Sequence, residues 1–347
     1  MITKRQQDVL RLIIQNYTEN EIPVGSKKLM ASGIEASSAT IRNEMKALEE
    51  VGLLAKTHSS SGRIPSIEGY RYYINHLLEP MTSSKKDVEQ IRRGLNREFH
   101  EINDVIQYAA TILSKLTNYT ALSLGPDLTD RVLTGFRIVP LNNRQIVAII
   151  VTDKGNVESQ VYTVPASFQS TDIEKIVQII NDRMVNESLW TVYQRLRTEI
   201  PMTMNRYFQS TDGILDFFEH VLSKAFEERV YVGGRMNLLD YEANQDSSAI
   251  KSMYSFMKNS EELTQLFASR EGNFQIRIGD EIGVKVLHNM SLIQANYPIK
   301  DHGLGTIALL GPTSMPYSKM YGLLETFSKE LSQKLIGYYQ ELDRSNQ

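Results

Sequence analysis

The sequence predicts an α+β protein with more than one domain, and three observations support this prediction. The chain has 347 residues, which is more than one hydrophobic core usually serves. Apolar residues recur at helical spacing through residues 1–80, whereas β-rich runs follow after residue 120. A second group of β-rich runs lies beyond residue 228, so helices and strands occupy separate stretches instead of alternating regularly.

Residues 25–65 predict two short helices followed by a basic β-hairpin. Ser26 is placed to cap the first of these helices, and Gly33 supplies the turn before the second. At about 100° of rotation per residue, the second helix has one apolar face. That face consists of Ile41, Met45 and Leu48. Ser37 or Ser38 is placed to cap this helix and to leave backbone N–H groups free near its start.

The opposite face of the second helix is polar and cationic. It consists of Ala39, Arg42, Asn43 and Lys46. In the major groove of DNA, arginine pairs with guanine and asparagine pairs with adenine, while an alanine methyl can contact thymine. The alternative interpretation is an ordinary surface helix with a solvated face. The residues on either side favour the interpretation as a DNA-reading helix.

A capping box at Thr3 and Gln6 predicts a first helix in front of this pair. After the pair, residues 54–58 predict a strand, residues 59–62 predict a tight polar turn, and Arg63 begins the returning strand. The cations of residues 54–78 outnumber the acids, and these cations are Lys56, Arg63 and Arg71. This order of elements is typical of a winged helix-turn-helix domain, which we place at residues 1–78, with residues 66–78 as a closing helix.

Beyond this domain the pattern is less specific. Residues 80–86 have a linker composition, and residues 87–116 predict one long helix. Helical spacing returns over residues 172–226, and a last helix is predicted over residues 316–342. Strands are predicted over residues 121–124, 133–139, 145–152, 157–164, 229–232, 274–278, 291–297 and 305–310.

Several runs of the sequence resemble the HrcA family of heat-inducible transcription repressors. The N-terminal runs are SSATIRNEMKALEEVGLL and SSSGRIPSIEGYRYYINHLL, and the later ones are KLTNYTALSLGP, RVYVGGRMNLL and GTIALLGPTSMPYSKM. The resemblance implies a winged helix-turn-helix domain followed by a GAF-like domain that is interrupted by an inserted dimerising domain. We therefore expect a linker and connecting helix at 79–116, a GAF-like domain in two segments, 117–164 and 229–345, and the dimerising domain at 165–228.

The resemblance also implies a function. Members of the family bind, as a homodimer, an inverted-repeat operator in double-stranded DNA called CIRCE, and thereby repress chaperone operons until heat stress. The chaperonin maintains their activity. The residues expected to contact DNA are Ser37, Ser38, Ala39, Thr40, Arg42, Asn43, Lys46, Ser61 and Arg63. The alternative is a ligand-sensing regulator whose GAF-like domain binds a metabolite.

Composition restricts the other classes of function. The chain has no cysteine, which excludes disulfides, thiol nucleophiles and cysteine-ligated metals. We expect no metal site, no cofactor and no catalytic residue, because the histidines are scattered and no catalytic signature is present. No apolar run approaches the roughly 20 residues of a membrane span. We therefore expect a cytoplasmic regulator with no membrane partner, not an enzyme.

Overall fold

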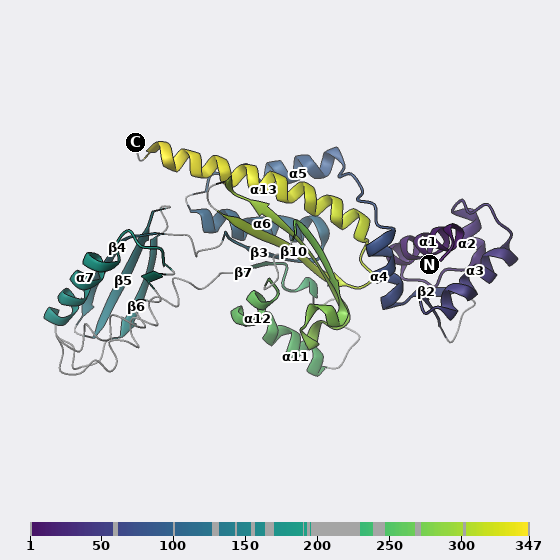
Figure 1. The fold of residues 1–347 in the computed structure, drawn as a ribbon, viewed down its shortest axis with the longest axis horizontal. Helices are drawn as coiled ribbons and strands as arrows, with labels where there is room; N and C mark the ends of the chain where they lie inside the picture. The colour runs from purple at the N-terminus through teal and green to yellow at the C-terminus, as the bar shows by residue number, and fades with distance from the viewer. Residues whose placement is uncertain are drawn as a thin grey trace. The chain divides into compact units, whose positions relative to one another are not determined.

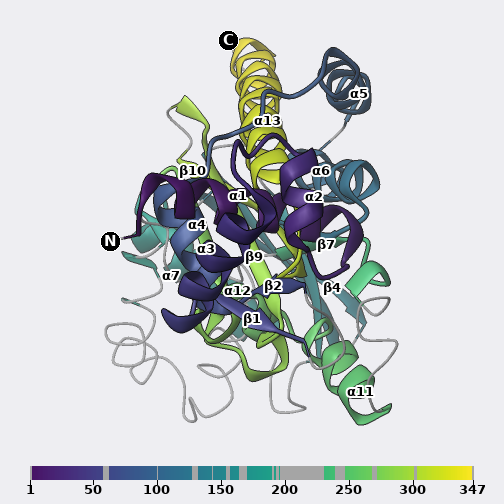
Figure 2. The same ribbon diagram turned by 90° about the vertical axis from the view of Figure 1, so that its right-hand side faces the viewer.

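The first domain in the computed structural model consists of three helices, a two-stranded wing and a closing helix. Its elements are α1 (Lys4–Asn20), α2 (Ser26–Ala31), α3 (Ser38–Glu50), β1 (Leu54–Lys56), β2 (Arg63–Pro65) and α4 (Ile67–His76). The capping box at Thr3 and Gln6 is present, which confirms the predicted start of α1. The apolar sides of α1 and α3 are buried and, with Leu29, form the centre of this domain, called the head below. Figures 1 and 2 show α1, α2 and α3 grouped at the N-terminal end of the chain.

The structure describes residues 2–57, 62–99, 101–126, 132–142, 144–153, 157–163, 170–189, 191–192, 195, 230–238, 247–267, 272–300 and 303–345. The chain divides into two compact units. The first comprises Met1–Gly125, Val230–Pro298 and Gly305–Tyr338, and the second comprises Pro126–Arg229 with residues 299–304 and 339–347.

A five-stranded sheet forms the centre of the rest of the first unit, called the core domain below. Its strands are β3 (Thr120–Leu124), β7 (Val230–Gly233), β8 (Phe274–Ile278), β9 (Met290–Pro298) and β10 (Leu304–Pro312), in the order β7-β3-β10-β9-β8. The three inner strands β3, β9 and β10 are buried along nearly their whole length, because helices cover both faces of the sheet.

Helices α11 (Ser247–Phe256) and α12 (Ser260–Gln265) contribute Met253, Phe256 and Leu263 to an apolar cluster on one face of this sheet. Figure 1 shows α6 (Ile102–Thr117) and α13 (Tyr317–Ser345) on the other side. Short 3-10 turns, Gly279–Ile282 and Lys285–Leu287, connect β8 with β9. Helix α13 buries one apolar side, which consists of Met320, Leu323, Leu324, Phe327, Leu331 and Leu335.

The single helix predicted over residues 87–116 is wrong, because the structure has two helices there. Helix α5 covers Lys85–Leu95, and α6 begins only at Ile102. Ile91 and Leu95 in α5 and Ile102 and Ile106 in α6 are all buried. The apolar spacing therefore continues across the break, which is why the sequence pattern did not reveal it.

The segment predicted as a linker at residues 80–86 is held against α13. The Met81 amide donates to the Ser318 carbonyl at 3.0 Å. The Ser83 hydroxyl donates to the Gly322 carbonyl at 3.0 Å and lies 2.8 Å from the Thr326 hydroxyl. Its polar composition therefore supplies hydrogen bonds to the helix, and we call residues 79–84 the strap.

The head also contacts the core domain directly. Arg71 of α4 binds Glu281 and donates to the Ile276 carbonyl at 3.3 Å. The Ser314 hydroxyl donates to Glu21 at the end of α1 at 2.8 Å. Together with the strap, these bonds connect the head to β8 and to the segment that leads into α13.

The second unit contains a three-stranded sheet, ordered β4 (Leu133–Asn142), β5 (Gln145–Thr152) and β6 (Val157–Thr163), and helix α7 (Ser170–Met184). Asn181 of α7 bonds both the amide and the carbonyl of Phe136 on β4, at 3.0 and 2.8 Å. Strands β4–β6 fall in the first expected segment of the GAF-like domain, 117–164. In the structure they form a sheet of their own and belong to the second compact unit. Most of the expected dimerising segment at 165–228 lies outside the described residues, so its role and the GAF-like character of the core domain stay predictions.

Candidate DNA-binding surface

Helix α3 has the two faces that the sequence predicts. Ser37 is its N-cap, and the Ser37 hydroxyl accepts from the Thr40 amide at 3.1 Å. The apolar residues Ile41, Met45 and Leu48 are each at most 2% exposed. The residues expected to read DNA are exposed; they are Ala39, Arg42, Asn43 and Lys46. The division into faces is confirmed, whereas DNA contact by these residues stays a prediction.

The polar side chains at the start of α3 are not all free for DNA. The Thr40 hydroxyl lies 2.9 Å from the Ser37 hydroxyl, so both belong to the cap. Lys46 pairs loosely with Glu50 at 3.6 Å, in an exposed ion pair that strong phosphate charges can displace. The Asn43 side chain makes no hydrogen bond with another described residue, so its carboxamide is available to a base edge.

Ser26 does not have the predicted role as a helix cap. Gly25 is the N-cap of α2, and Ser26 is the first residue of the helix, only 7% exposed. The Ser26 hydroxyl lies 2.8 Å from the Ser38 hydroxyl and accepts from Nε of Arg42 at 3.3 Å. Sequence reasoning missed this bond, because Ser26 and Arg42 are 16 residues apart and no local pattern links them.

The wing is a short antiparallel ribbon with an additional partner. Lys56 pairs with Arg63, and Leu54 pairs with Pro65. Val24 bonds the backbone of Arg63 from the other side, at 2.9 and 3.0 Å, and so extends the ribbon. Gly62 lies against Pro23, where a Cβ would come within 2.8 Å of backbone atoms. Ser61 of the expected wing tip lies outside the described residues.

Arg63, one of the expected DNA contacts, is bonded to a carboxylate of α3. Its side chain is 15% exposed, and its Nη2 lies 2.6 Å from Oε2 of Glu49 in α3. Its Nε donates to the same oxygen at 2.7 Å. The guanidinium therefore links the wing to the recognition helix, and a contact with phosphate would require it to leave this carboxylate.

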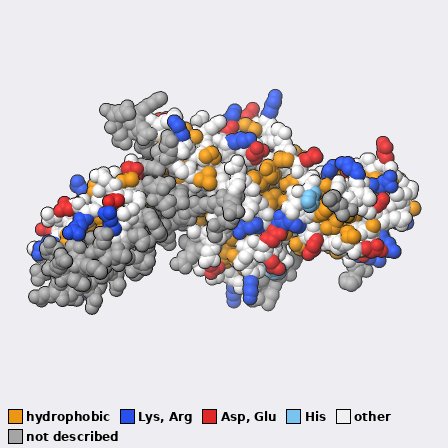
Figure 3. Space-filling model, viewed as in Figure 1, with side chains coloured by type: hydrophobic (Ala, Val, Ile, Leu, Met, Phe, Trp, Pro, Cys, Tyr) orange, Lys and Arg blue, Asp and Glu red, His pale blue; other side chains and the backbone are white. Residues whose placement is uncertain are grey.

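Other cations surround the reading face of α3. Lys27 and Lys28 are exposed in α2, and Lys56 is exposed on the wing. In helix-turn-helix proteins the first helix of the pair crosses the DNA backbone. The adjacent lysines Lys27 and Lys28 are a sequence signal for this role, and we add both as candidate phosphate contacts. Figure 3 shows that basic and acidic side chains are interspersed on the visible face of the head.

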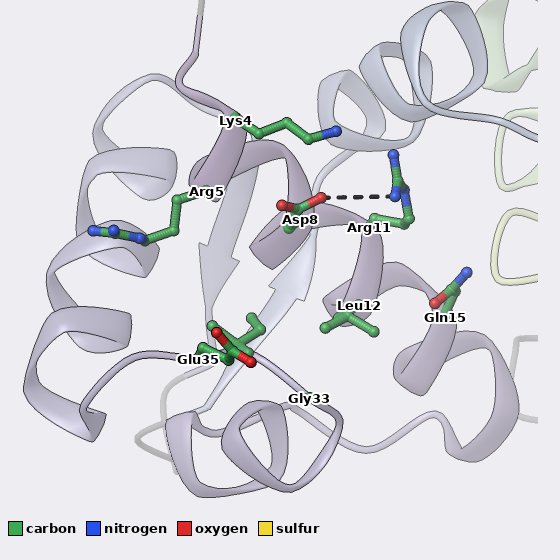
Figure 4. Close-up of a pocket in the computed structure, with 9 residues that line it drawn as sticks. Lys4, Arg5, Asp8, Arg11, Leu12, Gln15, Gly33 and Glu35 are labelled. Atoms are coloured by element: carbon green, nitrogen blue, oxygen red, sulfur yellow. Dashed lines mark ion pairs between the residues drawn. The ribbon is translucent and has the colours of Figure 1, made fainter.

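A cavity of about 650 Å³ lies elsewhere on the head, between α1 and the turn before α3 (Figure 4). Its lining mixes cations and acids; the residues are Lys4, Arg5, Asp8, Arg11, Leu12, Gln15, Gly33, Ile34 and Glu35. Arg11 and Asp8 form an ion pair across 3.6 Å. None of these residues belongs to the expected DNA-contact set, so this cavity is separate from the candidate surface.

Two further properties concern only the part of the chain that the structure describes. Within it, no group of three or more His, Cys, Asp or Glu side chains is positioned to hold a metal ion. Within the same residues, none of the helices combines the length and apolarity needed to span a bilayer.

The chain is similar to curated proteins over nearly its whole length. A protein of Enterococcus faecalis (strain ATCC 700802 / V583), named heat-inducible transcription repressor HrcA, is 61% identical over 345 residues, which cover 99% of each chain. A protein of Tetragenococcus halophilus with the same name is 59% identical over 343 residues, again covering 99% of each chain. The names describe regulators that are not enzymes, as the sequence predicts.

A solved structure described as a hypothetical protein at 2.2 Å resolution matches with a TM-score of 0.61. It is 24% identical in sequence, and the match covers 97% of this chain and 99% of that chain, so it supports the fold. Two family models also match. One, described as the winged helix-turn-helix transcription repressor HrcA DNA-binding domain, matches residues 1–76, and the HrcA protein C terminal domain matches residues 103–321. The chain therefore belongs to the HrcA family of heat-inducible transcription repressors.

Proposed function

We propose that this repressor binds, as a homodimer, an inverted-repeat operator of the CIRCE type upstream of chaperone operons, and represses them until heat stress. The observation that carries the proposal is the face of α3. A helix held by a buried apolar side exposes Ala39, Arg42, Asn43 and Lys46 together, and family membership adds the role of repressor.

The chemistry of this face suits the major groove of B-form DNA. Arg42 can pair with guanine O6 and N7, and Asn43 can pair with adenine N6 and N7. Lys46, together with Lys27 and Lys28, can neutralise phosphates, which supplies affinity without sequence preference. Base contacts would therefore come from the middle of α3, and the flanking lysines would orient the head.

An inverted repeat has a two-fold axis, and a symmetric dimer places identical heads on its two halves. We assign dimerisation to the second unit, in the region that includes residues 165–228. The expected stoichiometry is two chains per inverted repeat.

The test is a titration of full-length protein against a fluorescent duplex that carries the inverted repeat. Loss of a bidentate base contact costs about 1–3 kcal/mol, so Arg42→Ala should weaken operator binding by about 5- to 150-fold. Arg93→Ala is the matched control, because Arg93 is an exposed arginine on α5, outside the head. Equal affinities of Arg42→Ala and Arg93→Ala would contradict the assignment of the reading face.

The proposed control by chaperonin has a separate test. A titration of dilute repressor with excess operator DNA measures the fraction of repressor chains that can bind the operator. We expect chaperonin to raise this fraction, and a fraction that stays the same with and without chaperonin would remove this part of the proposal. Both partners would act in the cytoplasm, where the chromosome lies.

The alternative proposal is a regulator whose GAF-like domain senses a metabolite. A ligand that binds the native state raises its unfolding temperature in proportion to the logarithm of ligand concentration. A thermal-shift screen of small metabolites against the full chain distinguishes this alternative from control by chaperonin alone.

A further inference from the structure

Arg42 is the exposed residue of α3 with the greatest capacity to select a base, and its side chain is attached at one point to the neighbouring helix. Its Nε donates to the Ser26 hydroxyl at 3.3 Å. Ser26 is buried, at 7% exposure, whereas Arg42 is exposed. The bond therefore anchors the solvent-facing side chain to a fixed atom of the domain interior.

The direction of the hydrogen bonds follows from the chemistry of the groups. A guanidinium has donors and no acceptor, so the Ser26 oxygen must be the acceptor. The Ser26 proton is then free to point to the Ser38 hydroxyl, 2.8 Å away. Arg42, Ser26 and Ser38 thus form a chain of donors that joins the start of α2 to the start of α3.

The bond leaves the working end of the side chain free. Nε is the donor nearest the backbone, and guanine O6 and N7 can be reached by the two terminal Nη groups. An exposed arginine otherwise samples many rotamers, and that freedom is lost when it binds. Holding Nε in place reduces this loss.

We propose that Ser26 is a positioning residue for Arg42, which pre-organises the guanidinium for base recognition. This rests on the proposed function, since it assumes that Arg42 reads a base. Ser26 itself makes no DNA contact in this proposal. Its effect should therefore be visible only when the Arg42 side chain and its cognate base pair are both present.

The experiment is a double-mutant cycle on full-length protein with four chains: the parent, Ser26→Ala, Arg42→Ala and the double variant. Affinities are measured for the inverted repeat and for duplexes with a substituted base pair at each half-site position. Ser26→Ala should weaken operator binding by about 2- to 10-fold, which corresponds to the net free energy of one hydrogen bond. In the Arg42→Ala background the same change should have no further effect.

The base preference separates positioning from a purely structural role. Ser26→Ala should reduce discrimination at the base pair whose preference Arg42→Ala abolishes, and leave discrimination at other positions unchanged. Ser26→Thr retains a hydroxyl and should restore binding. Ser32→Ala is the matched control, because the Ser32 hydroxyl at the other end of α2 bonds the Lys28 carbonyl at 3.0 Å. It should leave base preference as in the parent.

The outcomes that overturn the proposal are distinct. If Arg42→Ala weakens binding and Ser26→Ala binds as the parent does, positioning is wrong and the reading face stands. Equal losses from Ser26→Ala in both backgrounds would show a structural role only. If Arg42→Ala binds as the parent does, both the reading face and the positioning role are wrong. Should Ser26→Ala fail to fold, Ser26→Cys keeps a side chain of similar size with only a weak acceptor, and the same cycle with this variant decides the question.

Discussion

Glu49 on the recognition helix binds Arg63 on the returning strand of the wing, with Oε2 lying 2.6 Å from Nη2 and 2.7 Å from Nε. One carboxylate oxygen thus receives two donors of the same guanidinium, and charge-assisted bonds of this length are among the stronger ones in proteins. The pair therefore ties the returning strand of the wing to α3.

Glu49→Gln should destabilise the full chain by about 1–3 kcal/mol, the cost of leaving buried donors of the Arg63 guanidinium without a charged acceptor. Urea unfolding measures this. The control is Glu50→Gln. Glu50 pairs with Lys46 on the same helix, and the side chains of Lys46 and Glu50 are 72% and 65% exposed. Exposed pairs contribute little, so this control should unfold as the parent does. Similar unfolding of both variants would contradict the anchoring role.

The salt dependence of DNA binding distinguishes an Arg63 that contacts phosphate from an Arg63 that stays bonded to Glu49. If it contacts phosphate, Arg63→Ala lowers the slope of log affinity against log salt by about one unit. Because the guanidinium is engaged by Glu49, we expect the slope to stay near that of the parent while the affinity falls. Lys46→Ala is the comparison that should show the full change. A slope reduced equally by both variants would show that Arg63 leaves Glu49 when DNA binds.

Gly322 of α13 lies directly beneath the strap, and a Cβ at this position would come within 1.7 Å of the Met81 carbonyl oxygen. Gly322→Ala should therefore destabilise the chain by about 1–3 kcal/mol, the range for overpacking. Gly337→Ala on the same helix is the control, because nothing lies within 4 Å of its Cβ. It should stabilise by about 0.5–1 kcal/mol through helix propensity. Denaturant midpoints compare the two, and a shift in the same direction would contradict close packing of the strap.

The strap illustrates what the sequence could and could not reveal. A run of small polar residues predicts a linker, and residues 80–86 do connect two domains. The Ser83 hydroxyl, which a linker would expose to solvent, instead donates to the carbonyl of Gly322, more than 200 positions away along the chain. Local composition carries no information about such a partner, so the anchoring of the strap could not be predicted.

The reading helix was predictable because its signal is local. A spacing of three and four residues selects Ile41, Met45 and Leu48 for burial, and the remaining positions must then face solvent. Strands β5 and β8 also match their predicted bounds, because turns or polar segments flank short β-rich runs. The cap role predicted for Ser26 was wrong, and the bond between Arg63 and Glu49 was not predicted, because both arrangements depend on side chains from another element.

Tyr70 and Tyr317 form a matched pair for the cost of a buried hydroxyl. Their rings lie 5.7 Å apart between α4 and α13, and both side chains are nearly inaccessible. The Tyr317 hydroxyl bonds Ser291 at 2.7 Å and the Thr313 carbonyl at 2.8 Å, whereas the Tyr70 hydroxyl has no hydrogen-bond partner among the described residues.

Removing a satisfied hydroxyl and an unsatisfied one should therefore have opposite effects. Tyr317→Phe should cost about 0.5–1.5 kcal/mol, and Tyr70→Phe should be neutral or stabilise by up to about 1 kcal/mol. Thermal unfolding of the two variants checks this. Equal destabilisation would show that the Tyr70 hydroxyl is bonded in solution, for example to water.

Tyr70 should also make the free energy of unfolding depend on pH in the alkaline range. Burial, and then the neighbouring Tyr317, raise the pKa of Tyr70 above its ordinary value of 10.0. The folded chain therefore retains a proton that the unfolded chain loses, so this contribution to stability is complete below pH 10 and declines as pH rises above it. The decline approaches about 1.4 kcal/mol per pH unit for one group. Tyr70→Phe removes that group, so its free energy of unfolding should fall less steeply than that of the parent in urea titrations between about pH 9 and pH 11.5. Parallel curves would mean that Tyr70 ionises as readily in the folded chain as in the unfolded one, and that the junction between α4 and α13 is open to water.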